Sequence, residues 1–172
     1  VDDSMKADST IIVNASNITV GDIEKITVHV NEDATGVINI SVDGKNYSAP
    51  IDKGIATFKI DNLASGSYDV LASYDGDENY LPGTNTSSFS VGKHNAPISV
   101  SAKDVKEGEN AVVHVILPAG ATGSVKVTVY DKSYTNQLID GKTTVTVPDL
   151  AKGSYIVNVN YSGDDNYLAN ST

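Results

Sequence analysis

The chain has 172 residues, with 12 lysines and no arginine, 22 acidic residues and a formal net charge of −10. This length suits one large domain or two small ones, and the acidic balance without arginine argues against nucleic-acid binding. The absence of cysteine excludes disulfides, thiolate zinc sites and cysteine nucleophiles, and no apolar run reaches the ~18–20 residues that span a bilayer.

Apolar and polar residues alternate along much of the chain, as in Ile26, Val28, Val30. A period of two with one apolar face predicts half-buried antiparallel strands, and the abundance of Val, Ile, Thr and Tyr supports this. No segment shows the 3.6-residue period of a helix, so we expect an all-β protein. In the first half, the expected strands lie near 11–15, 23–31, 37–43, 46–51, 54–61, 67–75 and 84–91.

The sequence repeats itself at a shift of about 87 positions without a gap. Residues 63–68 align with 150–155, and residues 74–81 align with 161–168. Counterparts of the strand at 84–91 would fall at 171–178, almost entirely beyond residue 172, so we expect the second repeat to lack its last strand, to have an uncovered strand edge and to be less stable. The predicted domains are an N-terminal tail or linker at 1–9, a repeat at 10–91, a linker at 92–97 and a second repeat at 98–172.

About seven short strands in about 80 residues, separated by turn signals, predict an immunoglobulin-like β-sandwich for each repeat. The pattern Leu-x-x-Gly-x-Tyr precedes the sixth strand and predicts a tyrosine corner, in which the phenol hydroxyl bonds to nearby backbone. We therefore expect two tandem immunoglobulin-like β-sandwiches. The corner residues are Leu63, Gly66 and Tyr68 in the first repeat and Leu150, Gly153 and Tyr155 in the second.

Together with Tyr-x-Gly-Asp-x-Asn-Tyr, this pattern resembles the bacterial immunoglobulin-like (Big-type) repeats of large surface adhesins. Ala-Thr-Gly at 34–36 and 121–123, with Lys-x-Tyr at 45–47 and 132–134, is similar to repeats in adhesin-like proteins of methanogenic archaea. The resemblance implies a fragment of a larger repeat protein at the cell surface, serving in adhesion. It implies no catalytic residues and no cofactor.

Asn-x-Ser/Thr occurs seven times, where about three instances are expected by chance. The excess indicates N-glycosylation, and the alternative is that Asn, Ser and Thr simply fill the solvent faces of strands. The candidate sites are Asn14, Asn17, Asn39, Asn46, Asn85, Asn160 and Asn170.

Acidic turns in both repeats offer oxygen atoms of the kind that calcium prefers. The spacing differs between the repeats and no bidentate glutamate follows, so we expect these side chains to stabilise turns and to bind no metal tighter than roughly millimolar. Calcium binding is the alternative. The residues are Asp75, Asp77 and Asn79, and Asp164, Asp165 and Asn166.

Nothing in the sequence indicates catalysis, because His29, His94 and His114 do not occupy matching positions in the repeats.

Tyr130 aligns with Asp43 and belongs to the second repeat alone, so with Tyr134 and Leu138 it is a candidate binding patch. Three functions stay open: a stalk in a surface adhesin, a module that itself binds a glycan or protein on a partner cell, and an ancillary domain of a secreted enzyme.

Overall fold

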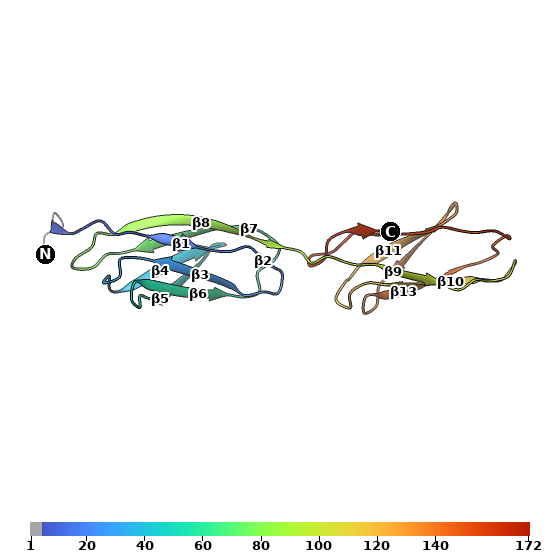
Figure 1. Cartoon of the computed structure of the whole chain (residues 1–172), viewed down its shortest axis with the longest axis horizontal. Helices are drawn as coiled ribbons and strands as arrows, with labels where there is room; N and C mark the ends of the chain where they lie inside the picture. The colour runs from blue at the N-terminus through green and yellow to red at the C-terminus, as the bar shows by residue number, and fades with distance from the viewer. Residues whose placement is uncertain (1–4) are drawn as a thin grey trace. The chain divides into compact units, whose positions relative to one another are not determined.

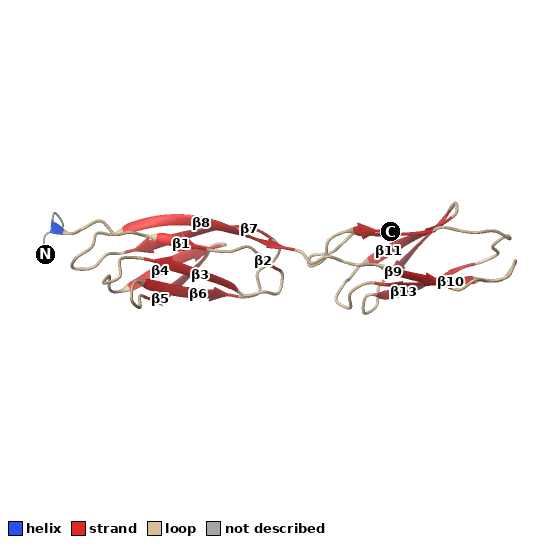
Figure 2. Ribbon diagram, viewed as in Figure 1, coloured by secondary structure: helices blue, strands red, loops and turns tan. Residues whose placement is uncertain are grey.

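The computed structural model describes residues 5–172, so residues 1–4 of the expected N-terminal tail lie outside the described residues. The chain forms two compact units, the first ending at Gly92 and the second spanning Lys93–Thr172. Apart from a short 3₁₀ turn at Met5, both consist of strands and loops, and the described residues form no α-helix (Figure 2). The predicted all-β class with tandem immunoglobulin-like sandwiches is confirmed.

Unit 1 is a sandwich of a three-stranded sheet, β1-β3-β6, and a five-stranded sheet, β2-β8-β7-β4-β5 (Figure 1). Neighbouring strands are antiparallel except β2 and β8, which are parallel. The strands are β1 (Ile12–Asn14), β2 (Ile18–Thr19), β3 (Glu24–His29), β4 (Val37–Val42), β5 (Lys45–Pro50), β6 (Ile55–Ile60), β7 (Gly66–Tyr74) and β8 (Gly83–Gly92).

The core of unit 1 comes from the alternating residues that the sequence places on one face of each strand. Ile26 and Val28 of β3 are fully buried. Ile38 and Ile40 of the opposite sheet have exposed fractions of 0% and 1%. The first expected strand, 11–15, follows the same alternation, but the chain changes sheets after it: β1 pairs with β3, and the additional strand β2 pairs with β8. Unit 1 thus has eight strands where seven were expected.

Unit 2 repeats this plan with sheets β13-β10-β9 and β12-β11-β14-β15. Its buried core is built almost entirely from valine and alanine, with Leu117 and Tyr161. The strands are β9 (Ser99–Ala102), β10 (Ala111–Ile116), β11 (Ser124–Val129), β12 (Lys132–Gln137), β13 (Lys142–Val147), β14 (Val157–Tyr161) and β15 (Asn170–Ser171).

The last strand of unit 2 is a two-residue stub rather than entirely missing, which corrects the expectation. Asn170 and Ser171 pair with Tyr161 and Asn160 as β15. They can do so because the corresponding strand of unit 1 begins at Gly83, one residue earlier than the sequence pattern indicates. The expected uncovered edge lies along the rest of β14.

The residues predicted as a linker, 92–97, largely belong to the two units. Gly92 ends β8, whereas the His94 N–H donates to Asn166 O at 2.8 Å and His94 O accepts from the Leu168 N–H at 2.8 Å. Ala96 is 2% exposed in the core of unit 2. The polar composition misleads because the backbone of this segment pairs while most of its side chains face solvent.

The predicted tail is held in the same way in unit 1. The Ala7 N–H donates to Asn79 O at 2.9 Å, and Ala7 O accepts from the Leu81 N–H at 2.8 Å. The chain therefore enters unit 1 beside the loop between β7 and β8. It leaves at Gly92, at the other end of the ten-residue strand β8, which runs the length of the unit (Figure 1).

Candidate functional site

The acidic turn of unit 1 is tied to a distant loop through the carboxylate of Asp77. Its Oδ1 accepts the N–H groups of Asn79 at 2.8 Å and Tyr80 at 2.9 Å. Its Oδ2 accepts the N–H of Thr35 at 2.9 Å and the Thr35 hydroxyl at 3.1 Å. Tyr74 completes the arrangement by donating its hydroxyl to Thr35 O at 2.7 Å. We call this network the loop clamp.

Unit 2 contains the same loop clamp around Asp164. Its Oδ1 accepts the N–H groups of Asn166 at 2.8 Å and Tyr167 at 2.7 Å, and its Oδ2 accepts the N–H and the hydroxyl of Thr122, each at 2.8 Å. Tyr161 donates to Thr122 O at 2.8 Å. The loop clamp thus explains Ala-Thr-Gly and Tyr-x-Gly-Asp-x-Asn-Tyr as parts of one structural device.

The glycine of the second motif is required by the close approach of the turn to itself. Gly76 has φ +85°, and a Cβ there would lie 2.6 Å from Tyr80 O. Gly163 has φ +84°, and a Cβ there would lie 2.8 Å from Tyr167 O. A side chain at either position would push the turn away from the loop that it binds.

This geometry favours the structural interpretation of the acidic turns over calcium binding. Both oxygens of Asp77 and of Asp164 already accept two hydrogen bonds each. Within residues 5–172, no three His, Asp or Glu side chains gather as a metal site would require. The other candidate residues, Asp75, Asn79, Asp165 and Asn166, have exposed side chains.

The hydrogen bonds also set the acidity of the loop clamp. Backbone N–H donors, Thr35 first, lower the pKa of Asp77 to about 2. Burial alone would raise the pKa of Asp164, but donors from Thr122, Asn166 and Tyr167 outweigh it and lower the pKa to about 2. Burial, reinforced by the nearby Asp77 charge, raises the pKa of Tyr74 to about 12.

The loop clamp predicts a loss of stability in acid. The pKa of Asp77 is about 2 in the folded state, against an ordinary value of 3.8. Its contribution to the stability of unit 1 is therefore complete above pH 3.8 and is lost as the pH falls from 3.8 to about 2. Thermal unfolding of unit 1 in Asp77→Asn should therefore show a shallower decline between pH 4 and pH 2, and a lower Tm at pH 7. Asp75→Asn is the matched control, and an Asp77→Asn profile parallel to the natural chain would contradict this assignment.

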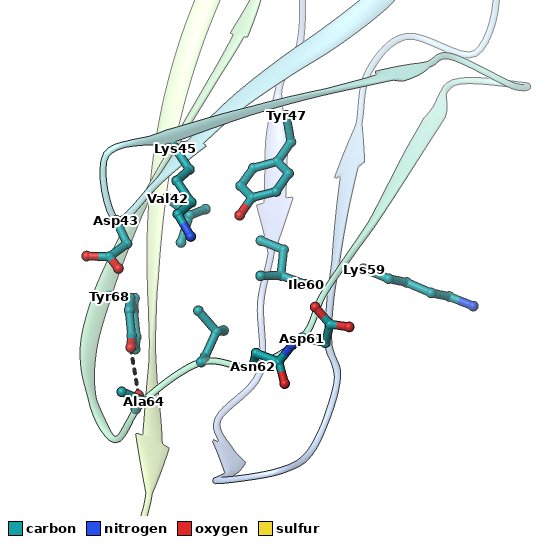
Figure 3. A pocket seen from close by; sticks show the side chains of 11 residues that line it. Val42, Asp43, Lys45, Tyr47, Lys59, Ile60, Asp61, Asn62, Ala64 and Tyr68 are labelled. Atoms are coloured by element: carbon teal, nitrogen blue, oxygen red, sulfur yellow. Dashed lines mark hydrogen bonds between the residues drawn. The ribbon is translucent and has the colours of Figure 1, made fainter.

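The tyrosine corner is present in both units. Tyr68 donates its hydroxyl to Ala64 O at 2.6 Å, shown as the dashed line in Figure 3, and Tyr155 donates to Ala151 O at 2.5 Å. Gly66 and Gly153, with φ +150° and +155°, permit the bend before the strand. Leu63 and Leu150 pack, half-buried, against their respective cores.

A shallow pocket of about 340 Å³ lies beside the corner of unit 1. Figure 3 shows the Lys59 side chain pointing away from the other lining groups. The pocket contains Tyr47 and Asn62, but its charged side chains do not converge on one point as a ligand site requires. The lining residues of this pocket therefore do not indicate a class of ligand.

The structure separates the seven glycosylation candidates by what their amides do. The amide nitrogens of Asn85 and Asn170, the atoms that would carry a glycan, donate to Ile11 O at 2.8 Å and Ala96 O at 2.9 Å. The half-buried Asn39 accepts the Ser48 hydroxyl through Oδ1, and Oδ1 of Asn17 accepts the Ser90 N–H at 2.8 Å. The exposed candidates Asn14, Asn46 and Asn160 fit glycosylation best.

Tyr130 is the most unusual residue on the surface of unit 2. Its side chain is 80% exposed, and its φ of +58° is a conformation in which a bulky side chain is strained. Its ring and the ring of Tyr155 are nearly perpendicular, at 86°, with their centroids 6.4 Å apart. Tyr134 and Leu138 instead pack half-buried against the core, so the expected patch reduces to Tyr130.

Two features escaped the sequence analysis. Glu24 is 0% exposed, and neither of its carboxylate oxygens has a hydrogen-bond partner of normal geometry. The alternation Glu24, Ile26, Val28 could have revealed it, because that period places Glu24 on the apolar face. The second feature is a groove of about 760 Å³ in unit 2, between its two sheets.

Comparison with known families agrees with this architecture. Residues 11–92 match the family model of the bacterial Ig-like domain (group 3), which supports the similarity of unit 1 to Big-type repeats. Unit 2 carries the same loop clamp and tyrosine corner. A search of curated proteins found no match. No helix of the described residues is long and apolar enough to cross a membrane.

Among solved structures, the chain is similar to fibronectin(III)-like modules of CbhA from Clostridium thermocellum, at 14% identity and a TM-score of 0.39, covering 95% of this chain and 90% of that one. It is similar to the adhesin InvE of Yersinia pseudotuberculosis at 16% identity and a TM-score of 0.41, covering 95% of this chain and 57% of that one. Tandem Ig domains of titin match at 14% identity and a TM-score of 0.36, with 90% of both chains covered. Similarity at this level says nothing about function.

Proposed function

We propose that the two units are tandem modules of a larger adhesin-like protein at the cell surface, where they act mainly as a stalk. The observation that carries this proposal is the path of the chain through unit 1. It enters beside the loop after β7 and leaves at the far end of β8. A module of this kind adds its own length each time it is repeated, whereas a catalytic domain gains nothing from repetition.

The repeated motifs support the same function. Asp77, Thr35 and Tyr74, like their counterparts in unit 2, are engaged in holding loops of one sandwich together. These repeated side chains are therefore occupied within each sandwich and are not free to hold a ligand. The similarity to repeats of archaeal adhesin-like proteins, and glycosylation at Asn14, Asn46 and Asn160, are parts of this proposal.

A second candidate function is that unit 2 itself binds a glycan or protein on a partner cell. One observation favours it: an aromatic side chain that is both strained and 80% exposed at Tyr130, where unit 1 has Asp43. An ancillary role in a secreted enzyme has no comparable observation in its support.

Surface display distinguishes the first two functions. Three cell lines display the same antigen-binding domain on a membrane anchor. In the first, both units separate the domain from the anchor; in the second, unit 1 alone does; in the third, the domain is fused directly to the anchor. If the units form a stalk, capture of antigen-coated beads rises with the number of units, and the chain without the added domain captures no partner cells. Attachment of partner cells to the bare chain, lost in Tyr130→Asp and kept in the control Ile156→Ser, would replace the stalk with the binding function.

A further inference from the structure

The outer face of the three-stranded sheet of unit 1 places two lysines side by side. Lys25 of β3 and Lys59 of β6 are direct partners in the antiparallel register, and both side chains are exposed. Residues directly opposite each other in antiparallel strands have Cβ atoms about 4.5–5.5 Å apart, and like charges at such positions destabilise the sheet. The chain has only 12 lysines against 22 acidic residues, so a surplus of cations does not explain this pairing.

No carboxylate neutralises the two lysines. Within residues 5–172, neither ammonium group forms an ion pair with an aspartate or glutamate. Glu24 precedes Lys25 in β3 but points to the opposite side of the sheet, where it is buried. Figure 3 shows the Lys59 side chain extending away from Asp61, which follows β6. This part of the face is therefore positive on a chain whose net charge is −10.

The rest of this face also contains no acidic residue within its strands. Its outward residues are Ile12 and Asn14 of β1, Lys25, Thr27 and His29 of β3, and Ile55, Thr57 and Lys59 of β6.

Unit 2 shows that the fold does not need the lysine pair. The positions 87 residues later are Val112 and Thr146, and they are direct partners in the same register between β10 and β13. The loop clamp and the tyrosine corner, in contrast, are present in both units. The lysine pair thus belongs to unit 1 alone and adds a repulsion that the common architecture does not require.

Hydroxyl groups lie beside the lysines on the same face. Thr27 and Thr57 are direct partners in the next outward row, and the side chain of Thr57 is exposed. Outward rows of a strand are about 7 Å apart, and a hydroxyl both donates and accepts hydrogen bonds. Strand β6 is at the end of the sheet order β1-β3-β6. A glycan on Asn14 of β1 would lie on the other side of β3 and leave this row accessible.

We propose that Lys25 and Lys59 bind a carboxylate of an acidic polysaccharide, while Thr27 and Thr57 bind hydroxyl groups of the same sugar chain. An anion between the two ammonium groups replaces their repulsion with two attractions. A uronic acid carries a carboxylate and hydroxyls on one ring, so one or two sugar residues span the ~7 Å between the rows. An acidic peptide supplies the carboxylate without these hydroxyls. This binding site is additional to the stalk function and does not depend on it.

Calorimetric titration tests the proposal with the whole chain, produced without glycosylation, and a hexamer of galacturonic acid. The fully methyl-esterified hexamer is the matched ligand control, because it keeps the sugar backbone and removes the charge. We expect weak, saturable binding of the acidic hexamer at one site, and little binding of the ester. Binding should weaken as the salt concentration rises, since salt screens exposed charges. Amide NMR shifts should change in β3 and β6 and stay constant in β10 and β13.

Variants of single lysines test which residues bind the sugar. Lys25→Gln and Lys59→Gln should each weaken binding about fivefold, the upper range for an exposed ion pair. Lys45→Gln removes the same charge from β5, on the other sheet of unit 1, and should leave binding unchanged. Without ligand, Lys25→Gln should raise the Tm of unit 1 slightly, because the repulsion is gone. Lost binding then cannot result from unfolding. Val112→Lys combined with Thr146→Lys should create a second site, in unit 2.

The proposal is wrong if the esterified hexamer binds as tightly as the acidic one, because the lysines then have no part in binding. Equal binding of polyglutamate would show that charge alone is recognised and that the ligand is not a sugar. No binding at millimolar hexamer, NMR shifts outside β3 and β6, or equal weakening by Lys45→Gln would also overturn it. The bead-capture experiment on the stalk alters neither lysine, so failure here leaves the stalk function standing.

Discussion

Unit 2 is expected to unfold well before unit 1 in the same molecule. In unit 1, β8 buries Phe89 and Val91 almost completely and bonds to both β7 and β2. Burying a side chain of this size contributes about 1.5–3 kcal/mol, so two such side chains alone place unit 2 roughly 3–6 kcal/mol below unit 1. The two-residue strand β15 replaces little of this.

Hydrogen exchange and limited proteolysis of the dilute chain measure the difference. Amides of β14 should exchange far faster than those of β7, and cleavage should begin within Lys93–Thr172. Phe89→Ala provides the matched test, because it should lower the stability of unit 1 by about 3–5 kcal/mol and bring the two transitions together. Equal protection of both units in the unmodified chain would show that β8 contributes little to the stability of unit 1.

Replacing Glu24 with Gln is expected to stabilise unit 1 at pH 7 by on the order of 1 kcal/mol, because burial costs an ionised carboxylate more than a neutral amide of the same shape. Burial raises the pKa of Glu24 above its ordinary 4.5, although Ser16 and the backbone offset part of this. The folded state therefore holds the proton more tightly than the unfolded state. Unit 1 loses stability as the pH rises from 4.5 through the raised pKa, and Gln removes that loss.

Urea unfolding at pH 4 and pH 7 tests this assignment. Glu24→Gln and the natural chain should be nearly equal at pH 4 and separate at pH 7. Glu32→Gln, at an exposed position, is the control, and the unit 2 transition is an internal reference because Ala111 occupies the matching position there. A variant that is less stable than the natural chain at pH 7 would show that the carboxylate has a stabilising partner.

Most of the fold could be predicted from local patterns. Alternation at Ile26 and Val28 identified a strand and its buried face, since successive side chains of a strand point to opposite sides. Leu-x-x-Gly-x-Tyr indicated a bend that depends on neighbouring residues, and Tyr68 indeed bonds only four positions back, to Ala64. The repeat then extended each prediction to the second half of the chain.

The candidate sites were less predictable because their meaning depends on distant partners. Asp77 looks like a calcium ligand beside its neighbours, yet half of its hydrogen bonds come from Thr35, 42 positions away. Tyr134 looks like a partner of Tyr130 but packs half-buried against the core. Residues 93–96 look like a linker because their side chains are mostly polar, although their backbone pairs with the loop at 166–168.

By itself, the sequence determined the all-β class, the two tandem repeats, the inward face of most strands and the tyrosine corners. These depend on periodicity and on turns spanning a few residues. Only the tertiary structure decided that the acidic turns serve as loop clamps and that Glu24 is buried with no hydrogen-bond partner of normal geometry. Each of these depends on which edges and loops meet when two sheets close over one core, and no local pattern encodes that meeting.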